Sequence, residues 1–156
     1  MSAAADPPPG FRRFPAQAGF IGVNGPLWFL HEDGRFRLGF HVEPRHCNPM
    51  GICHGGMLST FADMLMPIGA ALTVPELRRR FLPTVSLQVD FMRPAREGEW
   101  VEGETQVLRT TRQMVFAQGV VQSGGETALR CSGVFKIGAE FDRRFDLAEG
   151  GRGETP

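Results

Sequence analysis

The sequence has few cysteines and no excess of charge of either sign. Its three cysteines, an odd number, follow an opening segment, MSAAADPPPG, that lacks an apolar signal region, so a reducing, cytoplasmic location is expected. Seventeen basic residues balance seventeen acidic ones, which argues against nucleic acid or an anionic membrane as the partner. The apolar run from Met64 to Pro75 is interrupted by Pro67 and is shorter than the ~18 to 20 residues of a bilayer span, so no transmembrane helix is expected.

The chain is long enough for one domain and too short for two. It has 156 residues, of which 42% are hydrophobic and 22% charged, a composition close to that of ordinary globular proteins. Residues 1–10 are rich in proline and small residues, and residues 141–156 end in EGGRGETP. Both ends are therefore expected to be disordered at least in part. The domain is expected to span residues 11–140.

Local patterns predict a hairpin followed by one long helix. Residues 27–43 alternate apolar and polar side chains on both sides of Asp33-Gly34, a dipeptide typical of tight hairpin turns. A helical period then runs from about Gly55 to Leu72, and Pro67 inside it is expected to kink the helix.

A period of two returns after Pro83 and predicts four further strands, separated by turn signals. The apolar positions that define them lie at residues 85–91, 100–109, 114–120 and 129–137. Four long strands in sequence favour a meander. The hairpin, the helix and the four further strands together predict an α+β domain in which about six antiparallel strands wrap around one central helix.

The segment His54-Gly55-Gly56 stands at the predicted start of this helix. Backbone amides at a helix N-terminus carry partial positive charge, and glycine lets a ligand approach them closely. Gly55 and Gly56 are thus candidates for holding a carbonyl oxygen as it becomes an oxyanion. The alternative is that two glycines simply form the turn.

Asp63 is the one charged residue between Met57 and Pro75. At about 100° per residue it falls on a helix face of small residues, opposite the large apolar stripe. A solvated face would normally carry several charges, so this face is expected to pack against something. An acid sheltered near an oxyanion site is a candidate general base or nucleophile.

The sequence resembles the phenylacetate-pathway type of hotdog-fold acyl-coenzyme A thioesterases. The residues that carry this resemblance are Asn48, Gly51, His54-Gly55-Gly56, Asp63 and the segment from Thr84 to Pro94. The resemblance covers roughly residues 25–138. It implies the hotdog fold, with a curled sheet around a central helix.

The resemblance also implies residue roles. Gly55 would donate its amide to the thioester carbonyl, and Asp63 would be the base or nucleophile. Asn48 and His54 would orient the thioester and the attacking water. Thr84 stands where some members carry a hydroxyl that holds the water.

Several arginines are candidates for binding coenzyme A phosphates, since guanidinium groups bind phosphate with paired hydrogen bonds. They are Arg78, Arg79, Arg80, Arg93 and Arg112. A solvated loop charge is the alternative for each. The cluster His46, Cys47, Cys53 and His54 does not have the usual ligand spacing of a zinc site, so no metal and no cofactor are expected.

The expected activity is hydrolysis of an acyl-coenzyme A thioester with an aryl or medium-chain acyl group. The alternatives are a hotdog hydratase or dehydratase and a non-enzymatic acyl-coenzyme A sensor. Asp63 disfavours the sensor, and His-Gly-Gly with Asp63 fits a hydratase poorly.

Helix geometry predicts a homo-oligomer. Gly55 and Asp63 are eight residues apart, which at 1.5 Å per residue is about 12 Å along one helix, too far for both to act on one carbonyl carbon. If both are catalytic, they must come from different chains, so a homodimer with sites at the subunit interface is expected. A homotetramer made of two dimers is also compatible.

Overall fold

The computed structural model describes residues 6–15 and 19–141. The expected disorder of residues 142–156, and of residues 1–5 within the N-terminal segment, lies outside this range. Residues 6–10 lead into β1 (Arg12–Arg13), which pairs with β2 and precedes the short helix α1 (Gly19–Asn24). The sequence patterns did not predict β1 or α1.

The predicted hairpin is confirmed as β2 (Trp28–Glu32) and β3 (Arg35–His41). Asp33 and Gly34 both have positive φ, 51° and 71°, as a two-residue turn requires if it is to follow the twist of the two strands. The 3-10 turn η1 (Pro44–His46) then leads toward the central helix.

The predicted central helix is α2 (Gly55–Thr73), which continues through Pro67. This helix has 19 residues, and an 18-residue stretch of it has a mean hydropathy of 1.2, so by length and composition alone it could cross a membrane. Phe61, Ala62, Leu65 and Met66 on this helix are fully buried in the fold. This burial shows that α2 is the core helix of the domain.

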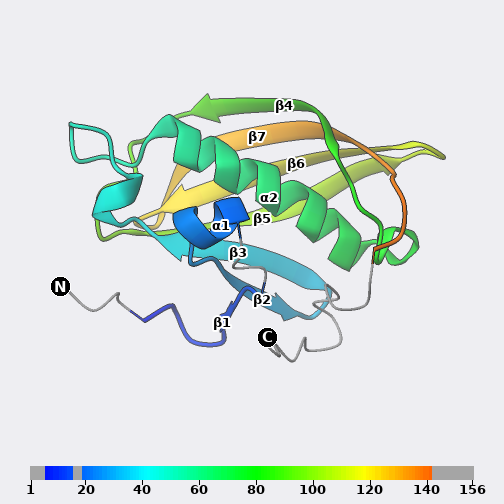
Figure 1. The fold of residues 1–156 in the computed structure, drawn as a ribbon, viewed down its shortest axis with the longest axis horizontal. Coiled ribbons are helices and arrows are strands. Elements are labelled where there is room, and N and C mark those ends of the chain that lie inside the picture. The colour runs from blue at the N-terminus through cyan, green and yellow to red at the C-terminus, as the bar shows by residue number, and fades with distance from the viewer. Residues whose placement is uncertain (1–5, 16–18, 142–156) are drawn as a thin grey trace.

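After the 3-10 turn η2 (Pro75–Leu77), the chain forms β4 (Thr84–Phe91), β5 (Trp100–Thr110), β6 (Met114–Ser123) and β7 (Glu126–Lys136). The sheet is antiparallel and curls around α2 (Figure 1). Its order is β1-β2-β3-β5-β6-β7-β4, seven strands where about six were predicted, because the two-residue β1 is too short for a periodic signal.

The predicted four-strand meander is wrong in one respect. β5, β6 and β7 follow one another in the sheet, but β4 pairs with β7 and not with β5. The connection from β4 to β5 therefore crosses the sheet, and β4 forms one edge. α2 and β4 lie close together at that edge (Figure 1).

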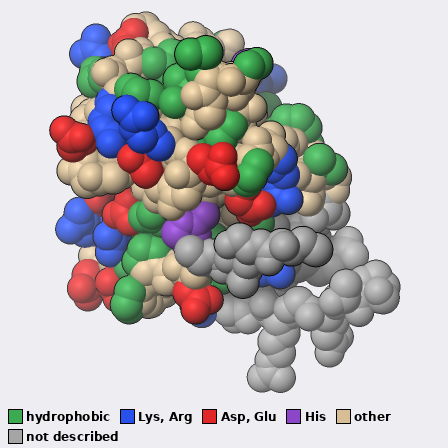
Figure 2. All heavy atoms as spheres, turned by 90° about the vertical axis from the view of Figure 1, so that its left-hand side faces the viewer, with side chains coloured by type: hydrophobic (Ala, Val, Ile, Leu, Met, Phe, Trp, Pro, Cys, Tyr) green, Lys and Arg blue, Asp and Glu red, His purple; other side chains and the backbone are tan. Residues whose placement is uncertain are grey.

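The core joins α2 to the inner face of the sheet, with Phe36, Phe40, Phe61 and Phe135 fully buried. One close approach requires a glycine: a Cβ on Gly69 would lie 2.4 Å from the Oγ1 atom of Thr105 on β5. On the outside, acidic and basic side chains are interspersed over the face shown in Figure 2, as the balanced charge of the chain suggests.

Candidate active site

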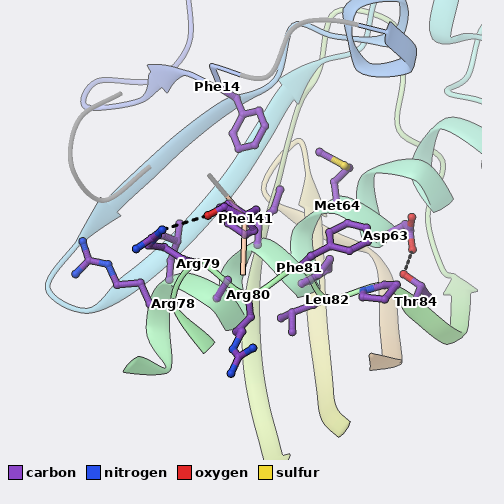
Figure 3. Close-up of a pocket in the computed structure, with 15 residues that line it drawn as sticks. Phe14, Asp63, Met64, Arg78, Arg79, Arg80, Phe81, Leu82, Thr84 and Phe141 are labelled. Carbon is purple, nitrogen blue, oxygen red and sulfur yellow. Dashed lines mark hydrogen bonds between the residues drawn. The ribbon is translucent and has the colours of Figure 1, made fainter. Parts of the chain in front are cut away.

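Asp63 and Thr84 are in direct contact. Thr84, the first residue of β4, donates a hydrogen bond of 2.6 Å from its Oγ1 atom to the Oδ1 atom of Asp63 in the middle of α2 (Figure 3). The resemblance assigns the hydroxyl of Thr84 to the attacking water. In this structure it orients the carboxylate, which is a positioning role.

The start of α2 differs from the expectation at Gly56. His54 is the N-cap residue, and its Nδ1 atom accepts a hydrogen bond of 2.8 Å from the Gly56 amide. That amide is therefore already bound, so Gly56 does not offer it to a substrate. The Gly55 amide has no hydrogen-bond partner among residues 6–15 and 19–141.

Gly55 also has a neighbour that the sequence patterns did not identify as part of the site. The ring of Phe91, the last residue of β4, lies against Gly55, where an added Cβ would be 3.3 Å from the Cζ atom. Phe91 is one of the apolar positions from which the strand was predicted, and 54% of it is exposed. The sequence signal that could have identified Phe91 as part of the site is a large apolar residue at the end of a predicted strand.

Asn48 lies in a tight turn before the helix. Its Oδ1 atom accepts a hydrogen bond from the Met50 amide at 2.9 Å. His46 holds this segment: it is 3% exposed, its Nδ1 accepts from the Glu43 amide at 3.0 Å, and its Nε2 contacts the Asn24 carbonyl at 2.9 Å. Burial lowers the pKa of His46, so this ring is a neutral structural group.

Two cavities divide the expected catalytic residues between them. The larger, of about 690 Å³, contains Asp63 and Thr84, and its walls are the residues Phe14, Met64, Pro67, Ile68, Ala71, Leu72, Arg78, Arg79, Arg80, Phe81, Leu82, Pro83 and Phe141. The smaller, of about 380 Å³, contains Asn48 and Gly55, with Ile52, Cys53, Leu58, Phe91, Met92, Arg93 and Pro94. In one chain, the acid and the Gly55 amide face different spaces.

Arg93, which was expected to bind phosphate, is held by several intramolecular hydrogen bonds. Its guanidinium donates to Glu99 at 2.9 and 3.0 Å, to Glu126 at 2.9 Å and to the Pro94 carbonyl at 3.0 Å. Hydrogen bonds from Arg93, and then from Ser123 and the Arg96 amide, lower the pKa of Glu99 to about 2. A guanidinium with all these partners has little capacity left for a ligand.

Three of the other expected phosphate ligands line the larger cavity. Arg79 reaches the Phe141 carbonyl at 3.4 Å, and Arg80 reaches the Gly138 carbonyl at 3.2 Å. Arg78 is exposed. Arg112 is exposed at the turn between β5 and β6 and lines neither cavity.

The cysteines near the site have the properties of structural thiols. Burial raises the pKa of Cys53 to about 12 and raises that of Cys47, which keeps both protonated and weakly nucleophilic. Within the described ranges, no group of three or more His, Cys, Asp or Glu side chains could hold a metal ion.

Comparison with known proteins agrees with this architecture. The sequence pattern of the thioesterase superfamily matches residues 50–129. A Pseudomonas aeruginosa protein named "Putative esterase PA0474" is 33% identical over 132 residues, which cover 83% of this chain and 96% of that protein.

Solved structures show the same fold. Zebrafish thioesterase superfamily member 2 has a TM-score of 0.70 at 25% identity and covers 80% of this chain and 93% of its own. A mutant of the phenylacetic acid degradation protein PaaI from Thermus thermophilus has a TM-score of 0.63 at 25% identity, covering 76% and 97%. With its seven-stranded sheet around one long helix, the chain has the hotdog fold and belongs to the thioesterase superfamily.

Proposed function

We propose that this protein hydrolyses acyl-coenzyme A thioesters to a free acid and coenzyme A, in two composite sites at the interface of a homodimer. Within the superfamily, the pattern from Asn48 to Asp63 supports a place near the phenylacetate-pathway type. The observation that carries the proposal is the division of Asp63 and Gly55 between two cavities of one chain. Each cavity then holds half of a hydrolytic site.

The position of β4 supports a second chain as the source of the missing half. The first residue of β4, Thr84, contacts Asp63, and the last, Phe91, contacts Gly55, so β4 runs past both half-sites. It is an edge strand of the sheet, and Val85 and Phe91 on it are 59% and 54% exposed. An edge with unpaired backbone groups and exposed apolar side chains favours pairing with another strand.

Antiparallel pairing of two β4 strands across a two-fold axis would place the start of each strand beside the end of the other. Asp63 and Thr84 of one chain would then lie near the partner's Phe91 and the partner's Gly55. This arrangement removes the separation of about 12 Å that prevents the two residues of one helix from acting together.

The proposed chemistry needs an acid, a hydrogen-bond donor and water. The Gly55 amide donates to the thioester carbonyl oxygen and stabilises the negative charge that develops on it. The Asp63 carboxylate removes a proton from water as the water attacks, or attacks the carbon itself to give an anhydride that water then cleaves. The carbon–sulfur bond breaks, and coenzyme A leaves as a thiolate that takes up a proton.

His54 and Asn48 would orient the reacting groups. Because the Nδ1 atom of His54 accepts a hydrogen bond, a neutral His54 ring carries its proton on Nε2, which can donate to the substrate. The side-chain amide group of Asn48 offers further donors.

Release of free thiol from a panel of aryl and medium-chain acyl-coenzyme A esters tests the activity. No release above background across the panel would refute it. The same assay separates a thioesterase from a hydratase, which leaves the carbon–sulfur bond intact, and from a sensor, which releases nothing.

Subunit complementation tests the composite site. Asp63→Asn removes the acid, and Gly55→Pro removes the amide at the first helical position, where proline is tolerated. After the two inactive proteins exchange subunits at random, about half of the dimers are mixed and each has one intact site, so about a quarter of wild-type activity should return.

Gly55→Ala is the matched control, since it keeps the amide; its Cβ would contact Phe91 at 3.3 Å. Copurification of two different tags shows that mixed dimers have formed. Mixed dimers without recovered activity would contradict the shared-site arrangement, while leaving the thioesterase activity of the wild-type protein in place.

A further inference from the structure

The larger cavity follows one side of α2 and has a polar group at each end. Asp63, Pro67 and Ala71 line it at four-residue intervals, as do Met64, Ile68 and Leu72. From Asp63 to Leu72 the helix rises nine residues, about 14 Å. The length and the volume of about 690 Å³ suit an extended acyl group of medium length.

The walls between the two ends are apolar. Figure 3 shows Met64, Phe81 and Leu82 between Asp63 on one side and Arg79 with Phe141 on the other. An acyl chain that starts at a carbonyl beside Asp63 and follows these walls therefore ends near Arg79.

Arg79 has a donor that the described part of the protein leaves unused. Its Nε atom is buried and has no hydrogen-bond partner among the described residues, and its Nη2 atom makes one long contact of 3.4 Å with the Phe141 carbonyl. A buried N–H without an acceptor is unfavourable, more so on a charged group. The site therefore favours a ligand that brings an acceptor.

The backbone fixes Arg79 in this place. Its φ of 63° is in the left-handed region, and its carbonyl accepts from the Phe141 amide at 2.9 Å. Its two neighbours differ: the side chains of Arg78 and Arg80 extend away from the other labelled residues (Figure 3), and Arg80 donates to Gly138.

We propose that the substrate is a medium-chain acyl-coenzyme A whose acyl group ends in a carboxylate, and that Arg79 binds this carboxylate. The inference rests on the proposed thioester hydrolysis and names its substrate class. A guanidinium offers paired donors in the geometry that a carboxylate accepts. In the proposed arrangement the acyl group occupies the larger cavity and coenzyme A lies on the other side of the thioester carbonyl, so Arg79 meets the acyl end and not the phosphates.

The test compares thioesters of equal chain length with and without the terminal carboxylate, at six, eight and ten carbons. For eight carbons, these are the mono-coenzyme A ester of octanedioic acid and octanoyl-coenzyme A. The wild-type protein should favour the dicarboxylic ester by at least about 10-fold in kcat/KM, as expected for hydrogen bonds to a charged group.

Arg79→Gln should lower this ratio by about 10- to 100-fold, and Arg79→Lys should retain part of it because it keeps a cation. Arg109→Gln is the matched control, since Arg109 is exposed on β5 and lines neither cavity; the ratio should not change. Dissociation constants of both esters, measured by calorimetry on Asp63→Asn, give the ratio without turnover.

A ratio near one in the wild-type protein, or one that Arg79→Gln leaves unchanged, overturns the inference while hydrolysis of octanoyl-coenzyme A still supports the proposed function. An equal loss for both esters in Arg79→Gln also overturns it, because that result assigns Arg79 to coenzyme A. If no ester is hydrolysed, the proposed function fails, and the ratio of dissociation constants still decides whether Arg79 binds a carboxylate.

Discussion

The hydrogen bond between Thr84 and Asp63 predicts a defined kinetic effect of Thr84→Val. Valine keeps the shape of threonine and removes the donor of the 2.6 Å bond to the Asp63 carboxylate. A hydrogen bond to a charged group contributes about 1.5 to 3 kcal/mol, and each 1.36 kcal/mol in an activation barrier is about tenfold in rate. If the bond holds Asp63 in its reactive orientation, kcat should fall by about 10- to 100-fold.

The assay is steady-state thiol release with the best thioester of the panel. Thr84→Val should lower kcat with little change in KM, while Thr84→Ser, which restores the hydroxyl, should stay close to wild type. Thr84 is exposed in the single chain, so the thermal stability of the variant should change little. A kcat within about twofold of wild type in Thr84→Val would refute a positioning role for Thr84.

Three further predictions concern catalysis and stability. Asp63→Asn should lower kcat by ~10² or more and leave substrate binding largely intact; near wild-type kcat would remove the acid from the mechanism. Glu99 forms an ion pair with Arg93 in which the Arg93 and Glu99 side chains are 24% and 20% exposed, and hydrogen bonds from Arg93, and then from Ser123 and the Arg96 amide, lower the Glu99 pKa from 4.5 to about 2. Ionised Glu99 should therefore contribute stability that is complete above about pH 4.5 and is lost as the pH falls through about 2, and Glu99→Gln should cost about 2 kcal/mol in urea unfolding at pH 7 and less than about half of that at pH 3. Gly69→Ala should destabilise the fold by about 1 to 3 kcal/mol in the same measurement, because its Cβ would lie 2.4 Å from Thr105 Oγ1; unchanged stability would mean that β5 moves freely away from α2.

Local sequence signals predicted most of the elements and most of the neighbouring strands, but not the pairing of β4. The helix from Gly55 and the hairpin at Asp33-Gly34 were predicted because periodicity and turn chemistry act over a few residues. Alternation in β4 does not say which strand lies beside it, so its pairing with β7 was missed.

In the site, too, features set by neighbouring residues could be predicted, whereas contacts between residues far apart in the sequence could not. The place of Asp63 on its helix followed from the period of the sequence, but its contact with Thr84 joins residues 21 positions apart. One ion pair of Arg93 joins it to Glu126, the first residue of β7 and 33 positions away, and no local pattern reveals this partner. The hydrogen bond from the Gly56 amide to His54 is local in sequence. It could not be predicted, however, because it depends on the rotamer of the His54 side chain.

The position of β4 at the sheet edge has a consequence for synthesis of the chain. β4 leaves the ribosome before β5, β6 and β7, and its neighbour in the sheet is the last of these. At about 5 to 20 residues per second, the nascent chain carries an apolar strand without its neighbour for seconds. Pairing distant in sequence is also slow to form. We therefore expect β4 to dock late and the Thr84–Asp63 contact to form only after β7 is complete. A chain truncated before β7 should expose an aggregation-prone segment.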